Sequence, residues 1–93
     1  MICVELQFDG SPDRLRARAM HRQRLDQLHA RGELLLAGPW QDDSGALLVF
    51  SADGDRVRQI IQEDPYYSVP GVTVRSVRAW TPIAGVGRPD HAG

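Results

Sequence analysis

Two short apolar segments, residues 33–38 and 46–51, constrain the fold most. Each carries apolar side chains at consecutive positions, which is typical of strands covered on both faces of a sheet. Pro39 ends the first segment, and the polar residues 41–45 lead into the second. This order predicts a hairpin with a longish loop in the middle of the chain.

A further strand is predicted on each side of this hairpin. Residues 2–8 alternate strictly between apolar and polar side chains, which indicates a half-buried strand. Residues 72–80 also alternate and are rich in β-branched residues, which favour strands. The predicted sheet therefore consists of the hairpin and these two flanking strands.

A first helix is predicted over residues 12–31, between the first strand and the hairpin. Ser11 is a candidate N-cap, and Pro12 suits the first helical position because the amide hydrogen that it lacks would be unpaired there anyway. Gly32 follows the helix, where a left-handed conformation is needed.

A second helix is predicted over residues 54–63, with Asp53 as its N-cap. Asp64 should end this helix, because a residue that precedes proline is pushed out of the helical region. A loop over residues 66–71 then leads to the last strand.

The resulting βαββαβ order predicts an α+β, ferredoxin-like domain over residues 1–82, followed by a loose tail over residues 83–93. The two helices can cover only one face of the sheet. Since both middle strands are apolar on both sides, the other face needs a partner, and a second copy related by a two-fold axis would provide it. We therefore expect a homodimer or a higher oligomer.

Composition excludes several other partners. The formal net charge of −1 gives no overall attraction to nucleic acid or to an anionic membrane. No segment approaches the roughly 18 apolar residues of a membrane span. Cys3 is the only cysteine, which rules out an internal disulfide, and no secretory signal is recognisable after Met1. A cytoplasmic location is the expectation.

The first predicted helix places an ionisable ring on its apolar stripe. His21 lies on this stripe, and Arg14 and Arg18 project from the same side of the helix. These residues suggest a small anion-accepting pocket around a histidine. His29 and His91 are expected to be solvated.

Three separated motifs resemble the YCII-related domain family. They are Arg18 with His21 on the first helix, the segment Gly32–Pro39, and the segment Glu63–Tyr66 at the end of the second helix. The resemblance spans roughly residues 1–82 and implies a dimeric α+β barrel. It also implies that His21 and Asp64 line a pocket as an enzymatic dyad. A few relatives act on chlorinated aromatic substrates, and similar barrels serve as small monooxygenases and isomerases.

The chemistry of this pair has two readings. As a dyad, Asp64 would bind the far nitrogen of His21, fix its tautomer and raise its basicity, so that the imidazole could exchange a proton near neutral pH. Alternatively, His21 is a core histidine bonded to a backbone carbonyl, and Asp64 only caps a turn. Arg18 could hold the carboxylate or phenolate of a substrate through a forked hydrogen bond, or it could be a solvated charge.

Gly38, Pro39 and Tyr66 are candidate pocket walls, because a ligand can approach the backbone closely at glycine and tyrosine offers a flat apolar face. Ordinary packing is the alternative role for Tyr66. No cluster of His, Cys and carboxylate residues has zinc-like spacing, and no phosphate loop or dinucleotide fingerprint is present. The sequence therefore predicts no metal and no organic cofactor.

Two functional classes remain open. The first is a cofactor-free enzyme, such as an isomerase or lyase, that performs acid/base chemistry on a small aromatic or carboxylated compound. The second is a non-catalytic module that binds a small ligand or a partner chain in the same cleft. Turnover would support the first class, and stoichiometric binding without turnover would support the second.

Overall fold

The computed structural model describes residues 1–85 of the 93-residue chain, and these residues form an α+β fold in the predicted βαββαβ order. The elements are β1 (Ile2–Phe8), α1 (Asp13–Ala30), β2 (Leu34–Pro39), β3 (Gly45–Phe50), α2 (Gly54–Glu63), the 3₁₀ turn η1 (Pro65–Ser68) and β4 (Val72–Ala79). Most of the tail predicted over residues 83–93 lies outside the described residues.

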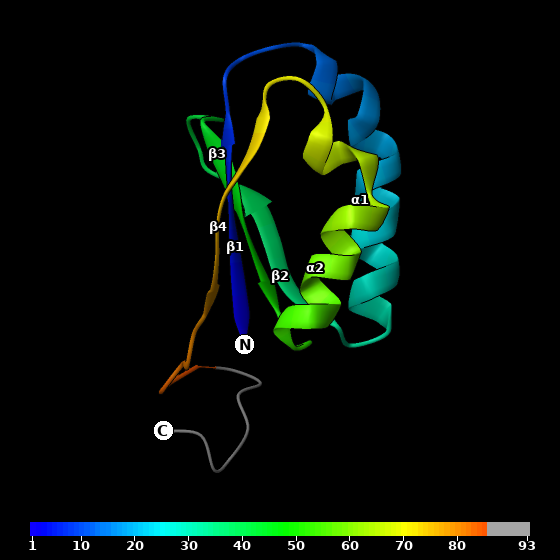
Figure 1. The fold of residues 1–93 in the computed structure, drawn as a ribbon. Helices are drawn as coiled ribbons and strands as arrows, with labels where there is room; N and C mark the ends of the chain where they lie inside the picture. Colours follow the sequence, from blue (N-terminus) through cyan, green and yellow to red (C-terminus); the bar gives the residue numbers. More distant parts are fainter. Residues whose placement is uncertain (86–93) are drawn as a thin grey trace.

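The strands form one sheet in the order β2-β3-β1-β4, in which every neighbouring pair is antiparallel. Both helices lie on the same face of this sheet (Figure 1). The predicted ferredoxin-like arrangement is therefore confirmed. The opposite face of the sheet carries no helix within residues 1–85.

Local signals place the helix ends. Asp53 accepts a hydrogen bond from the amide of Arg56 at 2.8 Å, as expected of an N-cap, and α2 has its predicted bounds. Gly32 follows α1 with φ of 81°, the left-handed conformation expected there. Helix α1 runs from Asp13 to Ala30, one residue shorter at each end than predicted. Pro12 rather than Ser11 therefore occupies the N-cap position, and no side chain caps the helix, although the amide of Asp13 donates to Ser11 Oγ at 3.4 Å.

As expected for helices that cover only one face, the single chain leaves the other face of the sheet open, and Leu36 on the edge strand β2 is 71% exposed. The structure corrects one expectation. The loop expected after α2 begins with η1, because Asp64 Oδ1 accepts the amide hydrogen of Tyr66 at 3.0 Å and thereby caps a new turn.

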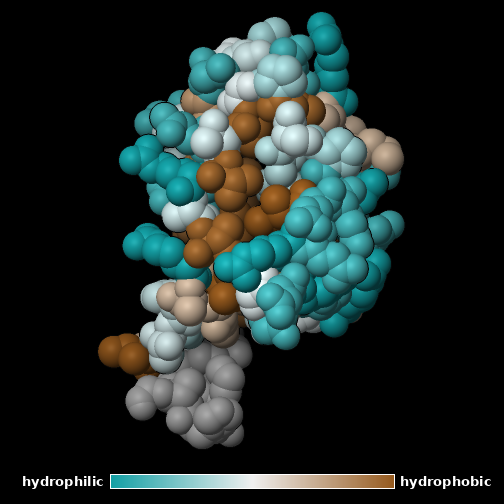
Figure 2. Space-filling view, viewed as in Figure 1, coloured by the Kyte–Doolittle hydropathy of each residue, from teal (hydrophilic) through white to brown (hydrophobic). Residues whose placement is uncertain are grey.

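The core lies between the helices and the face of the sheet that they cover. Its most deeply buried large side chains come from β1, β3 and α2: Val4, Leu6, Leu48, Phe50 and Val57. Burial of each of these side chains stabilises the fold by about 1.5–3 kcal/mol. Apolar side chains form a band between the strands and the polar outer surface of the helices (Figure 2). Leu28 joins α1 to this core, and α1 also contacts β2.

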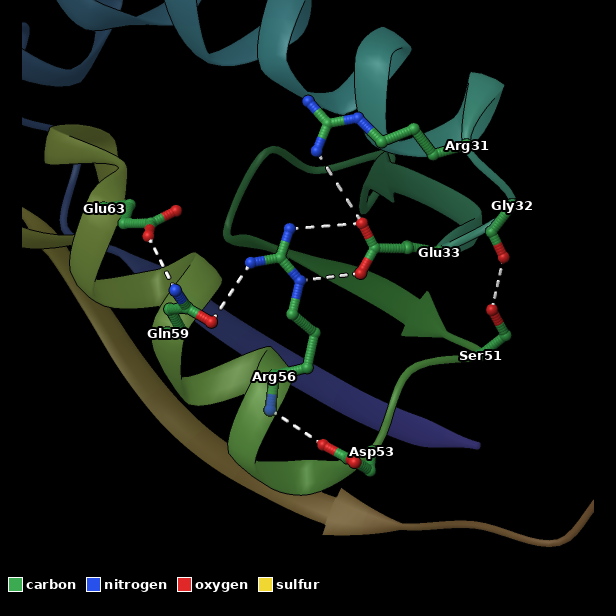
Figure 3. Close-up of polar contacts among 8 residues, drawn as sticks. All are labelled: Arg31, Gly32, Glu33, Ser51, Asp53, Arg56, Gln59 and Glu63. Carbon is green, nitrogen blue, oxygen red and sulfur yellow. Dashed lines mark hydrogen bonds and ion pairs between the residues drawn. The ribbon is translucent and has the colours of Figure 1, made fainter.

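A polar network fixes α2 against the start of β2 (Figure 3). Arg56 on α2 donates to both carboxylate oxygens of Glu33, from Nε at 2.6 Å and from Nη2 at 3.1 Å. These hydrogen bonds hold the pKa of Glu33 below its ordinary value. Gln59 extends the network from Arg56 to Glu63 along α2.

No helix among the described residues is long and apolar enough to cross a bilayer.

A Gly45→Ala substitution should destabilise the fold, because a Cβ at Gly45 would lie 2.0 Å from the backbone oxygen of Leu6. Separating β3 from β1 to relieve this clash should lower the free energy of unfolding by about 1–3 kcal/mol. The matched control is Gly38→Ala on the paired strand, where a Cβ meets nothing within 4 Å. Urea unfolding of both variants provides the test, and equal stabilities would contradict the expectation.

Candidate functional site

A cavity of about 640 Å³ lies between α1 and the helix-covered face of the sheet, within the size range of small-molecule sites. One wall is a single face of α1, made of Arg14, Arg18, His21, Arg22, Leu25, Asp26 and His29. The other wall comes from the strands and includes Leu6, Phe8, Ala46, Leu48 and all of β2. The cavity therefore brings a cationic helix face against an apolar sheet face.

His21 and Asp64 form a buried pair beside this cavity. The Nδ1 atom of His21 lies 2.8 Å from Oδ2 of Asp64, and the two residues are only 6% and 5% exposed. Helix α1 supplies the imidazole, while Asp64 ends α2 just before Pro65. The other carboxylate oxygen accepts the amide hydrogen of Tyr66, so both oxygens of Asp64 are fixed.

The charge of Asp64 determines the tautomer of His21. Burial acts to raise the pKa of Asp64, but the hydrogen bonds from His21 and from the amide of Tyr66 outweigh it and hold this pKa below its ordinary value. An ionised carboxylate can only accept hydrogen bonds, so Nδ1 of His21 is the donor. In the neutral imidazole, Nε2 is then left as a proton acceptor.

Two tyrosines of η1 hold the imidazole ring in place. The ring of Tyr66 stacks on His21 with centroids 3.9 Å apart and planes 5° apart, and Tyr67 meets the imidazole edge-on at 5.2 Å. Burial and the nearby charge of Asp64 raise the pKa of Tyr67 far above its ordinary value, so its hydroxyl stays protonated. The imidazole is thus fixed by a carboxylate, a stacked ring and a perpendicular ring.

The arginines of α1 give the cavity its positive charge. Arg14 is buried, forms an ion pair with Asp43, and holds its guanidinium carbon 4.2 Å from the ring centroid of Phe8. Arg18 and Arg22 form no ion pair within residues 1–85, so their charges are available to a ligand.

The profile of the YCII-related domain family matches residues 2–81 of this chain. The chain belongs to the YCII-related domain family. The resemblance seen in the sequence motifs is therefore confirmed, and it covers every helix and strand of the fold. No curated protein and no solved structure shows a significant match to the chain.

The YCII-related fold brings most of the predicted site residues together. Arg18, Gly38, Pro39 and Tyr66 all line the cavity. Asp64 does not line it but lies behind the imidazole, where it contacts His21. The contact excludes a backbone carbonyl as the partner of His21 Nδ1, whereas the catalytic and binding roles stay predictions.

The predicted exposure of His29 is confirmed, but no sequence signal pointed to Asp43. His29 is exposed, and it also lines the cavity, where its Nδ1 lies 2.9 Å from the carbonyl oxygen of Leu34. Asp43 forms an ion pair with Arg14, and no local sequence pattern predicts an ion-pair partner 29 positions away. The spacing of Arg14 and Arg18 did indicate that both lie on the His21 face of α1, and the structure confirms that both line the cavity with His21. His91 lies outside the described residues.

Within residues 1–85, no group of three or more histidine, cysteine or acidic side chains is arranged to hold a metal ion. The prediction that the protein uses no metal or organic cofactor stays a prediction.

Proposed function

We propose that this protein is a cofactor-free enzyme that performs acid/base chemistry, such as isomerisation or elimination, on a small aromatic or carboxylated anion. The observation that carries the proposal is the buried His21–Asp64 pair beside a cavity of about 640 Å³. Titratable groups brought together in a cleft are more often functional than those on a solvated surface.

In this mechanism His21 Nε2 accepts a proton from the bound substrate. The carboxylate of Asp64 stabilises the imidazolium that forms, because Nδ1 already donates to it. The cationic wall, including Arg18, stabilises the negative charge that develops on the substrate. The same imidazolium then returns the proton to another atom of the substrate or to a leaving group.

The test is a turnover assay with a panel of small aromatic and short-chain carboxylic acids, combined with crystal soaks of the same compounds. We expect at least one compound to be converted and to lie in the cavity against His21. Stoichiometric binding there without conversion of any compound would instead support a non-catalytic ligand-binding module.

The proposal includes a homodimer formed through the face of the sheet opposite the helices. This face carries Cys3 and Leu47, whose neighbours Val4 and Leu48 are core residues, and the charged residue Glu5, which pairs with Leu47. It also carries Leu36, which a register shift in β2 brings opposite Val49, the residue that pairs with Cys3. A second copy would cover these apolar side chains through a two-fold axis.

A Leu47→Asp substitution should prevent this association, because it would place a carboxylate in the apolar interface. We expect sedimentation velocity to show a dimer for the unmodified protein and an at least about 100-fold weaker association for the variant. The control is Met20→Asp, which introduces the same charge at an exposed position on α1. A monomeric unmodified protein at micromolar concentration would refute the proposed dimer.

A further inference from the structure

Arg14 lies in an environment that leaves one buried donor of its guanidinium without a hydrogen-bond partner among residues 1–85. The residue is only 7% exposed and lines the cavity. Its guanidinium lies over the ring of Phe8 and donates from Nη2 to Asp43, but its buried Nε has no hydrogen-bond partner within residues 1–85. A buried donor without a partner is unfavourable, and this one lies on the edge of the guanidinium that the Nη2 atom also occupies.

Arg56 shows what this edge can bind. Its Nε and Nη2 atoms donate together to the two carboxylate oxygens of Glu33, at 2.6 Å and 3.1 Å (Figure 3). This forked geometry is the strong form of an arginine–carboxylate contact. Asp43 engages only Nη2 of Arg14, so it satisfies half of the same fork.

Asp43 comes from a different environment than Arg14. It lies in the turn between β2 and β3, its side chain is 60% exposed, and its φ of 59° is uncommon for a residue other than glycine. Its amide donates to the carbonyl oxygen of Trp40 at 2.9 Å. The carboxylate therefore reaches Arg14 from a solvent-exposed turn at the cavity wall.

We propose that Arg14 is the binding residue for the carboxylate of the ligand, and that Asp43 occupies the place of this carboxylate in the free protein. The inference rests on the proposed function and adds the position of the anionic group. A ligand carboxylate inside the cavity would accept from both Nε and Nη2 of Arg14 and release Asp43 to solvent. The exchange satisfies the buried Nε and leaves Asp43 hydrated.

This position also defines the ligand. Arg14 and His21 lie on one face of α1, two helical turns or about 10 Å apart along the axis. The ring of Phe8 lies under the guanidinium, and the ring of Tyr66, which stacks on His21, meets Phe8 edge-on at 6.4 Å. An aryl or short-chain carboxylate would thus lie along an aromatic wall, with its carboxylate at Arg14 and its reacting carbon nearer His21.

The test is a calorimetric titration with benzoate at concentrations up to about 10 mM. The Asp43→Asn variant should bind benzoate roughly fivefold more tightly than the unmodified protein, because a partly exposed competing ion pair is removed. The matched control is Asp42→Asn, which removes the same charge from the same turn, where Asp42 contacts only Ser44. Equal effects of the two variants, or no binding by Asp43→Asn, would overturn the inference.

Arg14→Gln should abolish benzoate binding, and Arg14→Lys should weaken it strongly because an ammonium lacks the fork. Circular dichroism checks their folding, and if either variant unfolds, the comparison of Asp43→Asn with Asp42→Asn still decides. Unchanged binding by a folded Arg14→Gln variant would overturn the inference. Benzoate binding requires no proton transfer, so the titration reports on Arg14 independently of turnover. Failure of the turnover assay would therefore reject the proposed enzyme while leaving the role of Arg14 intact.

Discussion

Replacing His21 with Gln is expected to lower kcat by about 10²- to 10⁴-fold, the contribution of a positioned general base. Glutamine keeps a side chain that can donate to Asp64 but cannot exchange a proton near neutral pH. The fold should survive, and the substrate identified by the turnover assay should still bind. Steady-state kinetics on this substrate, with circular dichroism of the variant, provides the measurement.

His29→Gln is the matched control for this experiment. His29 is a second histidine on α1 that lines the same cavity, but its Nδ1 bonds to the carbonyl oxygen of Leu34 instead of a carboxylate. We expect its kcat to stay within a few-fold of the unmodified protein. Full activity of a folded His21→Gln variant would rule out proton transfer by His21 and favour the ligand-binding module.

Asp64→Ala is expected to lower the free energy of unfolding by about 3 kcal/mol. The substitution leaves two buried donors, Nδ1 of His21 and the amide of Tyr66, without their acceptor, and each such loss costs about 1–3 kcal/mol. The control is Asp55→Ala on the same helix, whose exposed carboxylate only approaches Arg58 at 3.8 Å. Urea unfolding should give a clearly lower free energy of unfolding for Asp64→Ala than for Asp55→Ala. Equal values would show that the buried His21–Asp64 pair does not hold η1 against α1.

Asp64 should also make the free energy of unfolding depend on pH. Because the folded pKa of Asp64 is held below its unfolded value, its carboxylate contributes stability above that unfolded value, and this contribution is lost as the pH falls through the folded pKa. Below about pH 4 the unmodified protein should therefore lose more stability than Asp64→Asn does. Unfolding free energies measured from pH 7 to pH 2 test this, and parallel curves for the two proteins would contradict it.

The sequence by itself determined the order and approximate bounds of the helices and strands, and it identified His21 and Asp64 as a candidate pair. The alternation in residues 2–8 encodes β1, and Asp53 with the residue before Pro65 encodes both ends of α2, because caps and side-chain periodicity act within a few positions of the chain. The motifs shared with the YCII-related domain family then paired His21 with Asp64, which no local pattern could do.

The tertiary structure alone decided which strand became the edge and what surrounds the histidine. The apolar pattern of residues 33–38 predicts a strand but not its place in the sheet, and the strand order puts β2 at the edge, with Leu36 exposed in the single chain. Tyr66 could be read as a pocket wall, yet its stacking on His21 depends on how η1 folds back against α1. The Arg14–Asp43 pair joins a helix to a distant turn. Such contacts depend on the order of strands and on how a turn approaches a helix, which apolar spacing along the chain does not specify.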